Sequence, residues 1–288
     1  MHSSSLLRLA GVVFAAVTFV VIGDTAGKLL TARGVDPFFI AWTRFALAAA
    51  VLLPFSGLTL RELPNLRDWR VLVRGTFITI GICCILTALR TEPIANVFGA
   101  FFVGPIVSYV LATLFMGEKP SRSRSMLLAL GFLGVLLVVK PGFGASTGMV
   151  FALAAGGCYG AYLAMTRTVA GLYRLRFLLM SQLIVGSILL TPFGLTVSFP
   201  DFGQPIVVFI IASALSSALG NFLLVVASKS AEASLVAPLV YSQLFSATVA
   251  GLLVFEELPD GYAMLGLMLI AISGFGSLFI HHKQARHV

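Results

Sequence analysis

The sequence predicts an all-α integral membrane protein with ten transmembrane helices, arranged as two inverted five-helix repeats with both termini in the cytoplasm. Three observations lead to this fold class: an apolar composition, a self-similarity between the two halves, and an uneven distribution of positive charge. Hydrophobic residues make up 59% of the chain and charged residues 10%, and the mean hydropathy is +1.03. Such a composition excludes an ordinary water-soluble domain.

Ten apolar runs are each expected to form a transmembrane helix, because a helix needs about 20 apolar residues to cross the hydrocarbon core. The runs cover residues 9–30, 37–56, 71–90, 93–116, 125–140, 147–166, 177–197, 205–228, 232–255 and 261–280. None of them shows the strict alternation of a membrane β-strand. The first run follows Arg8 like a signal peptide, but its counterpart at 148–166 favours a retained helix.

The two halves of the chain are copies of one another. When the sequence is shifted by 139 positions, Gly81 falls on Gly220 and Glu118 on Glu257. The first helix repeats at an offset of 137. This self-similarity predicts two five-helix repeats, residues 1–142 and 143–288. Because five is odd, the second repeat must cross the membrane in the opposite direction, as in secondary transporters that alternate access about a central site.

Basic residues gather on one side of this predicted bundle. With a cytoplasmic N-terminus, fourteen of the 19 lysines and arginines fall in cytoplasmic segments, Arg74 among them. Four fall in outer segments, and Arg44 is expected to be the one basic residue inside a helix. The positive-inside rule therefore places both termini in the cytoplasm. This asymmetry accounts for the net charge of +8, which is no argument for a nucleic-acid partner.

Two ionisable residues inside the bilayer, Asp24 and Arg44, are candidate site residues. Both lie roughly 10 Å from the outer end of their helices at 1.5 Å per residue. An intramembrane charge costs at least ~2.5–3.5 kcal/mol, so it normally has a partner and faces the bundle interior. One interpretation makes Asp24 a proton-coupling or amine-binding carboxylate and Arg44 the holder of a substrate carboxylate. The other interpretation is a structural pair of Asp24 with Arg44 or with Lys28.

The fourth and ninth runs carry matching faces. A helix-loosening residue, Gly99 or Pro238, lies one turn before an aromatic residue, Phe102 or Tyr241. Interrupted helices in matching positions of two halves indicate a binding site, whereas glycine and aromatic residues can also simply pack helix against helix. The face predicted on the ninth run consists of Ser234, Pro238, Tyr241, Phe245 and Thr248.

Further polar groups are expected at mid-membrane depth. Tyr159, Asn221 and Gln243 could each offer a hydrogen bond to a solute. All four histidines lie in the terminal tails, and no nucleotide or metal motif occurs. We therefore expect no catalytic residue, metal or cofactor, and a transporter rather than an enzyme.

These features resemble the EamA-like members of the drug/metabolite transporter superfamily, with the amino-acid exporter branch as a candidate. The matching stretches are Trp42-Thr-Arg44-Phe45-Ala46, Ala88-Leu-Arg90, Gly104-Pro105-Ile106, Gly117-Glu118, Gly131-Phe132-Leu133-Gly134-Val135, Lys140-Pro141-Gly142 and Tyr159-Gly160-Ala161-Tyr162. The resemblance implies a ten-helix inverted repeat with a cavity lined mainly by helices 1, 3, 4, 6, 8 and 9. Asp24 departs from the family pattern, where a small residue is common.

We interpret the chain as a multi-pass carrier that exports small metabolites, with amino acids favoured, across the bacterial inner membrane by alternating access. A face that is aromatic and weakly polar suits an apolar or zwitterionic solute, and its single buried Asp and Arg do not suit a polyanion. The main alternative is a drug or organic-cation efflux carrier that would use Asp24 and the aromatic rings. A channel and a membrane-embedded enzyme are less favoured. A proton is the candidate coupling ion.

Overall fold

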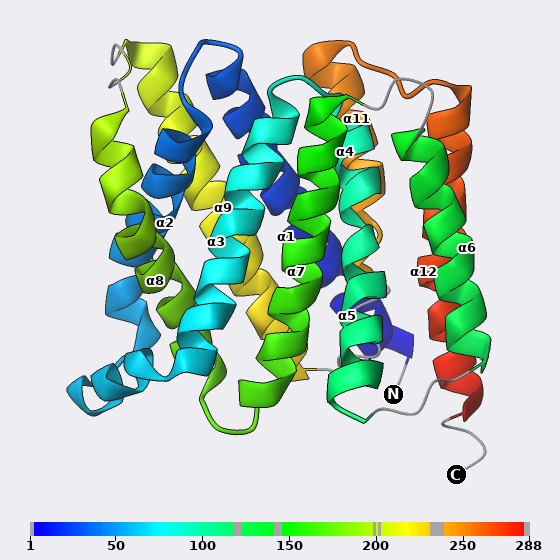
Figure 1. Cartoon of the computed structure of the whole chain (residues 1–288), viewed down its shortest axis with the longest axis horizontal. Helices are drawn as coiled ribbons and strands as arrows, with labels where there is room; N and C mark the ends of the chain where they lie inside the picture. The colour runs from blue at the N-terminus through cyan, green and yellow to red at the C-terminus, as the bar shows by residue number, and fades with distance from the viewer. Residues whose placement is uncertain are drawn as a thin grey trace.

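The computed structural model describes residues 3–117, 122–140, 146–197, 200, 203–230 and 239–284. Within these ranges the regular secondary structure is helical and contains no strand. The helices stand side by side in one bundle (Figure 1), with α6 and α12 at one edge. The start of α1 and the end of α12 lie at the same end of the bundle.

Seven of the helices are about as long as a bilayer is thick or longer, and the others are shorter. The long helices are α1 (Ser3–Thr31), α2 (Pro37–Ser56), α3 (Trp69–Leu89), α7 (Thr147–Val169), α8 (Leu175–Thr196), α9 (Gln204–Ser230) and α12 (Gly261–Gln284). The shorter helices are η1 (Leu60–Arg67), α4 (Ile94–Phe101), α5 (Val103–Phe115), α6 (Arg122–Val139) and α11 (Gln243–Phe255). The 3₁₀ helix η1 lies between α2 and α3, where the sequence indicated only a loop.

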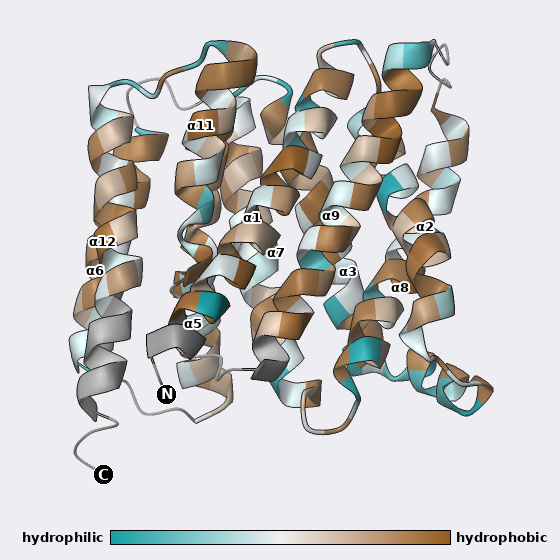
Figure 2. Ribbon diagram, turned by 180° about the vertical axis from the view of Figure 1, so that it is seen from behind, coloured by the Kyte–Doolittle hydropathy of each residue, from teal (hydrophilic) through white to brown (hydrophobic). Residues whose placement is uncertain are grey.

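Length and composition make this an all-helical, multi-pass membrane protein. Within the described residues, seven segments are long and apolar enough to span a bilayer, α4 and α5 counting as one, and shorter apolar stretches of α6, α11 and α12 accompany them. Figure 2 shows apolar residues along the helices and hydrophilic residues mainly toward the two ends of the bundle. The predicted fold class is confirmed at this level.

Polar residues set several helix boundaries. Asp36 precedes α2 and accepts a hydrogen bond of 2.7 Å from the backbone of Phe38. Asp68 caps α3 in the same way and also accepts from the side chains of Arg70 and Tyr173. These donors, Arg70 first, lower the pKa of Asp68 to about 2. The caps satisfy amide groups that a helix start leaves without an intrahelical partner.

The fourth predicted helix is interrupted, as its matching face indicated, but the break lies at Phe102 and not at Gly99. α4 ends at Phe101 and α5 begins at Val103, with Phe102 between them at φ −69° and ψ 4°. Pro105 has no N–H to donate to the carbonyl of Phe101, four residues earlier, so the regular helix cannot continue. That carbonyl oxygen lies instead against Gly156 of α7.

Small residues let the helices pack closely. The principal helix pairs are α1 with α9, α3 with α7, α2 with α8 and α6 with α12. In the last pair, Gly134 and Gly266 face each other, and a Cβ on Gly266 would lie 2.5 Å from the backbone oxygen of Gly134. Close approach through small residues is the usual means of association between membrane helices, because lipid provides no hydrophobic drive.

Replacement of Gly266 by alanine is therefore expected to separate α6 from α12. Overpacking of a tight contact typically costs about 1–3 kcal/mol, so the melting temperature of the purified protein should fall. Gly157→Ala in α7 is the matched control, because nothing lies within 4 Å of the methyl group it adds. Equal melting temperatures for the two variants would show that the Gly134–Gly266 crossing is not tight.

Candidate functional site

A cavity of about 80 Å³ lies among α1, α2, α3, α8 and α9. Its wall combines polar groups with aliphatic and aromatic side chains. The lining residues are Val20, Asp24, Arg44, Phe45, Ala48, Leu52, Ile78, Ile82, Leu179, Gln182, Leu183, Ser217, Ala218 and Asn221. Three of the residues singled out from the sequence, Asp24, Arg44 and Asn221, therefore meet at one place. The lining differs from the one expected: α2 and α8, the second and seventh predicted helices, take part, whereas the fourth, sixth and ninth do not.

Asp24 and Arg44 form a buried ion pair in this wall. Nη1 of Arg44 lies 2.6 Å from Oδ1 of Asp24, and the two residues are 6% and 3% exposed, respectively. Arg44 also donates to the backbone oxygen of Gly23 at 2.8 Å and to the hydroxyl of Ser213 at 2.9 Å. The guanidinium thus joins α1, α2 and α9. The depth argument placed these two side chains in contact correctly.

Lys28 does not pair with Asp24, although the sequence allowed that contact. Its ammonium group lies 2.5 Å from the carboxylate of Glu257, donates to the backbone oxygen of Glu92 at 2.8 Å, and lies 4.6 Å from the ring centre of Phe255. This contact joins α1 to the segment between α11 and α12. The alternative pairing of Asp24 is therefore not the one the protein uses.

A second buried arginine corrects the assignment of Arg74 to a cytoplasmic loop. Arg74 lies inside α3 and is only 3% exposed. It donates to Thr166 and Tyr162 of α7 at 2.8 Å each and to Gln182 of α8 at 3.0 Å. Arg44 is thus not the only basic residue inside a helix. Arg74 lies near the start of its helix, close to the loop arginines, so the sequence alone does not distinguish it from them.

A continuous series of aromatic contacts leads from α11 to Arg74. The rings of Tyr241 and Phe102 stack with centroids 4.5 Å apart, and Phe101 contacts Tyr159 at 4.8 Å. The remaining contacts are Phe101 with Phe102 at 6.4 Å, Tyr159 with Tyr162 at 5.8 Å, and Tyr162 with the Arg74 guanidinium at 4.6 Å. We call this series the aromatic ladder. It unites Tyr159, Phe102 and Tyr241, none of which lines the cavity of Asp24.

The other candidates occupy different surroundings. Gly99 packs against Val138 of α6 and Leu267 of α12, so its place in the fold is a helix contact. Gln243 is buried at the start of α11, and Asn221 donates to the backbone oxygen of Ser217 at 2.8 Å. Pro238 lies outside the described residues. Phe245 is 65% exposed, so the face predicted to run from Tyr241 to Phe245 does not continue.

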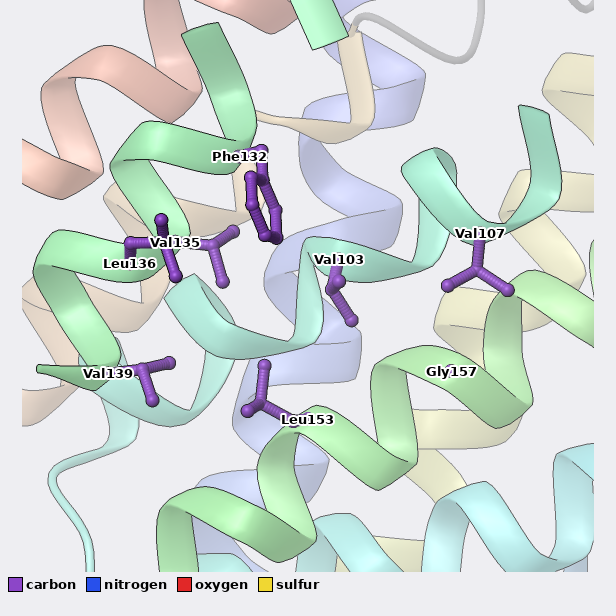
Figure 3. Close-up of a pocket in the computed structure, with 8 residues that line it drawn as sticks. All are labelled: Val103, Val107, Phe132, Val135, Leu136, Val139, Leu153 and Gly157. Carbon is purple, nitrogen blue, oxygen red and sulfur yellow. The ribbon is translucent and has the colours of Figure 1, made fainter. Parts of the chain in front are cut away.

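A larger hollow of about 350 Å³ between α5, α6 and α7 is apolar throughout. Figure 3 shows its lining: Val103, Val107, Phe132, Val135, Leu136, Val139, Leu153 and Gly157. No side chain there can hold a charge or direct a hydrogen bond, so this hollow cannot orient a polar solute. The mixed cavity of Asp24 and Arg44 is the better candidate site. In the described part of the chain, no cluster of metal-ligating side chains occurs.

Comparison with known proteins gives consistent matches. The model of the EamA-like transporter family matches residues 5–140 and again 146–279. A riboflavin transporter of Vibrio cholerae is 26% identical, over 90% of this chain and 88% of the relative. An S-adenosylmethionine uptake transporter of Rickettsia felis is 25% identical, over 91% and 88%.

The pseudopaline exporter CntI of Pseudomonas aeruginosa is 26% identical, over 70% of this chain and 72% of the exporter. A solved crystal structure superposes with a TM-score of 0.65 over 99% of both chains at 15% identity, which shows a shared fold. The named relatives are transporters of different small molecules, and they are not named for amino acids.

The pair Asp24–Arg44 is expected to behave as one energetic unit. Removing one partner leaves a buried, unpaired charge, which typically lowers the free energy of unfolding by about 3–5 kcal/mol. Removing both partners lowers it less. Asp24→Asn and Arg44→Gln should therefore each lower the melting temperature strongly, and the double variant should be milder than the sum. Thermal unfolding of the four proteins measures this coupling. Strict additivity would mean that the two side chains do not interact.

Proposed function

Because the chain belongs to the EamA-like transporter family, we propose that it is an alternating-access carrier of small amphipathic metabolites in the bacterial inner membrane. The carrier consists of ten transmembrane helices in two inverted repeats, residues 1–142 and 143–288, with both termini in the cytoplasm. Amino acids are the solutes that the sequence favours, and export is the favoured direction.

The observation that carries this proposal is a matched pair of helix interruptions. The first lies at Phe102 between α4 and α5, and the second lies at Tyr241 and Ser242 just before α11. Phe102 and Tyr241 are 139 positions apart, which is the repeat offset, and their rings stack on each other. Interrupted helices at equivalent positions of two repeats are typical of transporter sites that rearrange around a bound solute.

The helix pairing supports the inverted repeat. The helix counterparts in the two repeats are α1 and α7, α2 and α8, α3 and α9, and α6 and α12. Exchanging counterparts turns the pair α1–α9 into the pair α3–α7. The same operation maps α2–α8 and α6–α12 onto themselves. Two halves related by a twofold axis in the membrane plane would have this set of contacts.

The size of the cavity supports a carrier that must change conformation. A cavity of about 80 Å³ is smaller than the cavity of about 150 Å³ that admits benzene, so it would have to enlarge to admit an amino acid. At the end predicted to face outward, Lys28 is bound to Glu257 and Lys140 to Asp260. Both pairs join the first repeat to the second, so they would have to separate when that end opens.

The charge of the cavity favours zwitterions over organic cations. Asp24 is its one acidic lining residue, and that carboxylate already binds Arg44. A cationic solute would have to displace a buried guanidinium at 2.6 Å. Riboflavin and S-adenosylmethionine, for which two relatives are named, both contain a flat ring system, which suits the aromatic ladder. Aromatic amino acids combine a flat ring with a zwitterion.

Counterflow in proteoliposomes tests the function. Vesicles loaded with unlabelled phenylalanine should accumulate labelled phenylalanine, because a carrier exchanges solute across the membrane and saturates. Competition by other amino acids, riboflavin, S-adenosylmethionine and tetraphenylphosphonium would rank the solute classes. Transport without saturation or counterflow would indicate a channel, and preference for tetraphenylphosphonium would favour the organic-cation alternative.

The stacked rings should affect substrate preference as well as stability. Phe102→Ala and Tyr241→Ala are expected to shift the ranking of bulky against small solutes. Phe102 is 5% exposed and belongs to the same buried core as Phe98, so its truncation also lowers stability. Phe98→Ala is the matched control, because this ring is 1% exposed and contacts Phe101 rather than Tyr241. Loss of the Phe98 ring should lower the free energy of unfolding by ~3–5 kcal/mol. If all three variants lose stability alike while the ranking stays the same, the stacked pair is core packing.

Cysteine labelling tests the topology. Leu60 in η1 is 84% exposed and Leu258 before α12 is 62% exposed, so both positions accept a probe. In intact cells, an impermeant maleimide should label Leu258→Cys and leave Leu60→Cys unlabelled until the membrane is opened. The wild-type chain is the background control, because Cys83, Cys84 and Cys158 lie inside helices. Equal labelling from one side would refute the inverted repeat.

A further inference from the structure

Arg74 is a buried cation without a carboxylate partner. Its guanidinium binds four neutral oxygens: the hydroxyls of Tyr162 and Thr166, the amide oxygen of Gln182 and the backbone oxygen of Leu178, at 2.8 to 3.0 Å. No acidic side chain in the described part of the chain forms an ion pair with it. Neutral acceptors compensate a buried positive charge only in part.

Arg74 and Arg44 occupy exchanged positions of the two repeats. Residues 37–56 align with 175–194 at an offset of 138, so that Phe39 matches Phe177, Pro54 matches Pro192 and Arg44 matches Gln182. At the offset of 139, Arg74 matches Ser213. Arg44 of α2 contacts Ser213 of α9, and Arg74 of α3 contacts Gln182 of α8. Because α2 matches α8 and α3 matches α9, these two contacts are equivalent, but the arginine lies on the other helix of the pair.

The two exchanged clusters differ in charge. The Arg44 cluster contains the carboxylate of Asp24 and is neutral. Among the described residues, the Arg74 cluster contains no carboxylate and keeps one positive charge. One arginine of the pair therefore has an aspartate beside it, whereas the equivalent arginine has only neutral partners among the described residues.

Gln182 connects Arg74 to the cavity. The Gln182 side chain lines the cavity and accepts the hydrogen bond from Nη2 of Arg74. Ser217 lines the same cavity, is 6% exposed, and has no hydrogen-bond partner for its hydroxyl among the described residues. If the Gln182 amide turned aside, the Arg74 guanidinium would become accessible from the cavity, where the Ser217 hydroxyl is also free to donate a hydrogen bond.

We propose that Arg74 is the anchor for the carboxylate of the transported solute, with Gln182 as a displaceable placeholder and Ser217 as a further polar contact. The planar fork of a guanidinium matches the two oxygens of a carboxylate. A single uncompensated positive charge suits a monoanionic group better than a phosphate dianion. The aromatic ladder, which ends on Arg74 at Tyr162, would receive a ring attached to that carboxylate. This inference deepens the proposed function and rests on it for the identity of the ligand as a transported solute.

The decisive variant is Gln182→Glu, because it places a carboxylate where the amide oxygen lies 3.0 Å from Arg74. The purified full-length protein in lipid nanodiscs is titrated with 3-phenylpropanoate and with the uncharged 3-phenylpropanamide, and the melting temperature is followed. The wild-type protein should be stabilised by the carboxylate and not by the amide. In Gln182→Glu, stabilisation by the carboxylate should disappear, while the ligand-free melting temperature stays equal or rises.

Two further variants keep the test independent of folding defects. Arg74→Lys retains the charge without the fork and should weaken binding of 3-phenylpropanoate by about tenfold, since the paired hydrogen bonds are lost. Ser217→Ala removes a hydroxyl that has no partner, so it should fold normally and bind more weakly. Equal response of the wild-type protein to the two ligands, or unchanged carboxylate binding in Gln182→Glu, would overturn the inference.

Transport measurements separate this inference from the proposed function. If phenylalanine counterflow persists in Gln182→Glu with unchanged half-saturation, the carrier function stands and the role of Arg74 is wrong. If the nanodisc titrations behave as expected while no solute shows counterflow in the wild-type protein, Arg74 binds carboxylates and the carrier function fails.

Discussion

A positive charge enclosed by apolar helices needs hydrogen-bond or ionic partners from neighbouring helices, and the interior of this bundle depends on that constraint. Lys28, Arg44 and Arg74 all lie inside helices and are all buried. Each reaches across to other helices for its partners. These contacts join α1 to α2 and α9, α3 to α7 and α8, and α1 to the segment before α12. The charged side chains therefore hold the two halves of the bundle together where lipid gives no hydrophobic drive.

The same contacts explain how one bundle can be both stable and movable. Small residues such as Gly134, Gly156 and Gly266 bring backbones close and make extended, specific helix contacts. The interruptions at Phe102 and Tyr241 lie where the rings of these two residues stack on each other. A bundle of this kind can retain its helix pairs while the segments beside the interruptions change direction. The alternating access proposed for this protein would use that combination of rigid pairs and local hinges.

The site shows how a duplicated fold acquires asymmetry. Equivalent positions of the two repeats hold Arg44 and Gln182, and Ser213 and Arg74. The contact between these positions persists in both halves, whereas the charge has moved from one helix to the other. Only one of the clusters has its own carboxylate. Binding specificity can therefore evolve on one side of the axis while the geometry of the contact is kept by both.

The sequence by itself determined the multi-pass membrane class, the approximate positions of most helices, the offset between the halves and the similar depth of Asp24 and Arg44. Hydropathy, repeat spacing and depth are properties of the linear chain. Only the tertiary structure decided that Lys28 pairs with Glu257, that Arg74 is buried, and that the aromatic ladder and the cavity are separate. Each of these depends on which side chains from distant helices meet, and on rotations of a helix about its axis. A residue near a helix end such as Arg74 can face water or a neighbouring helix with the same sequence around it, and the packing of α7 and α8 makes that choice.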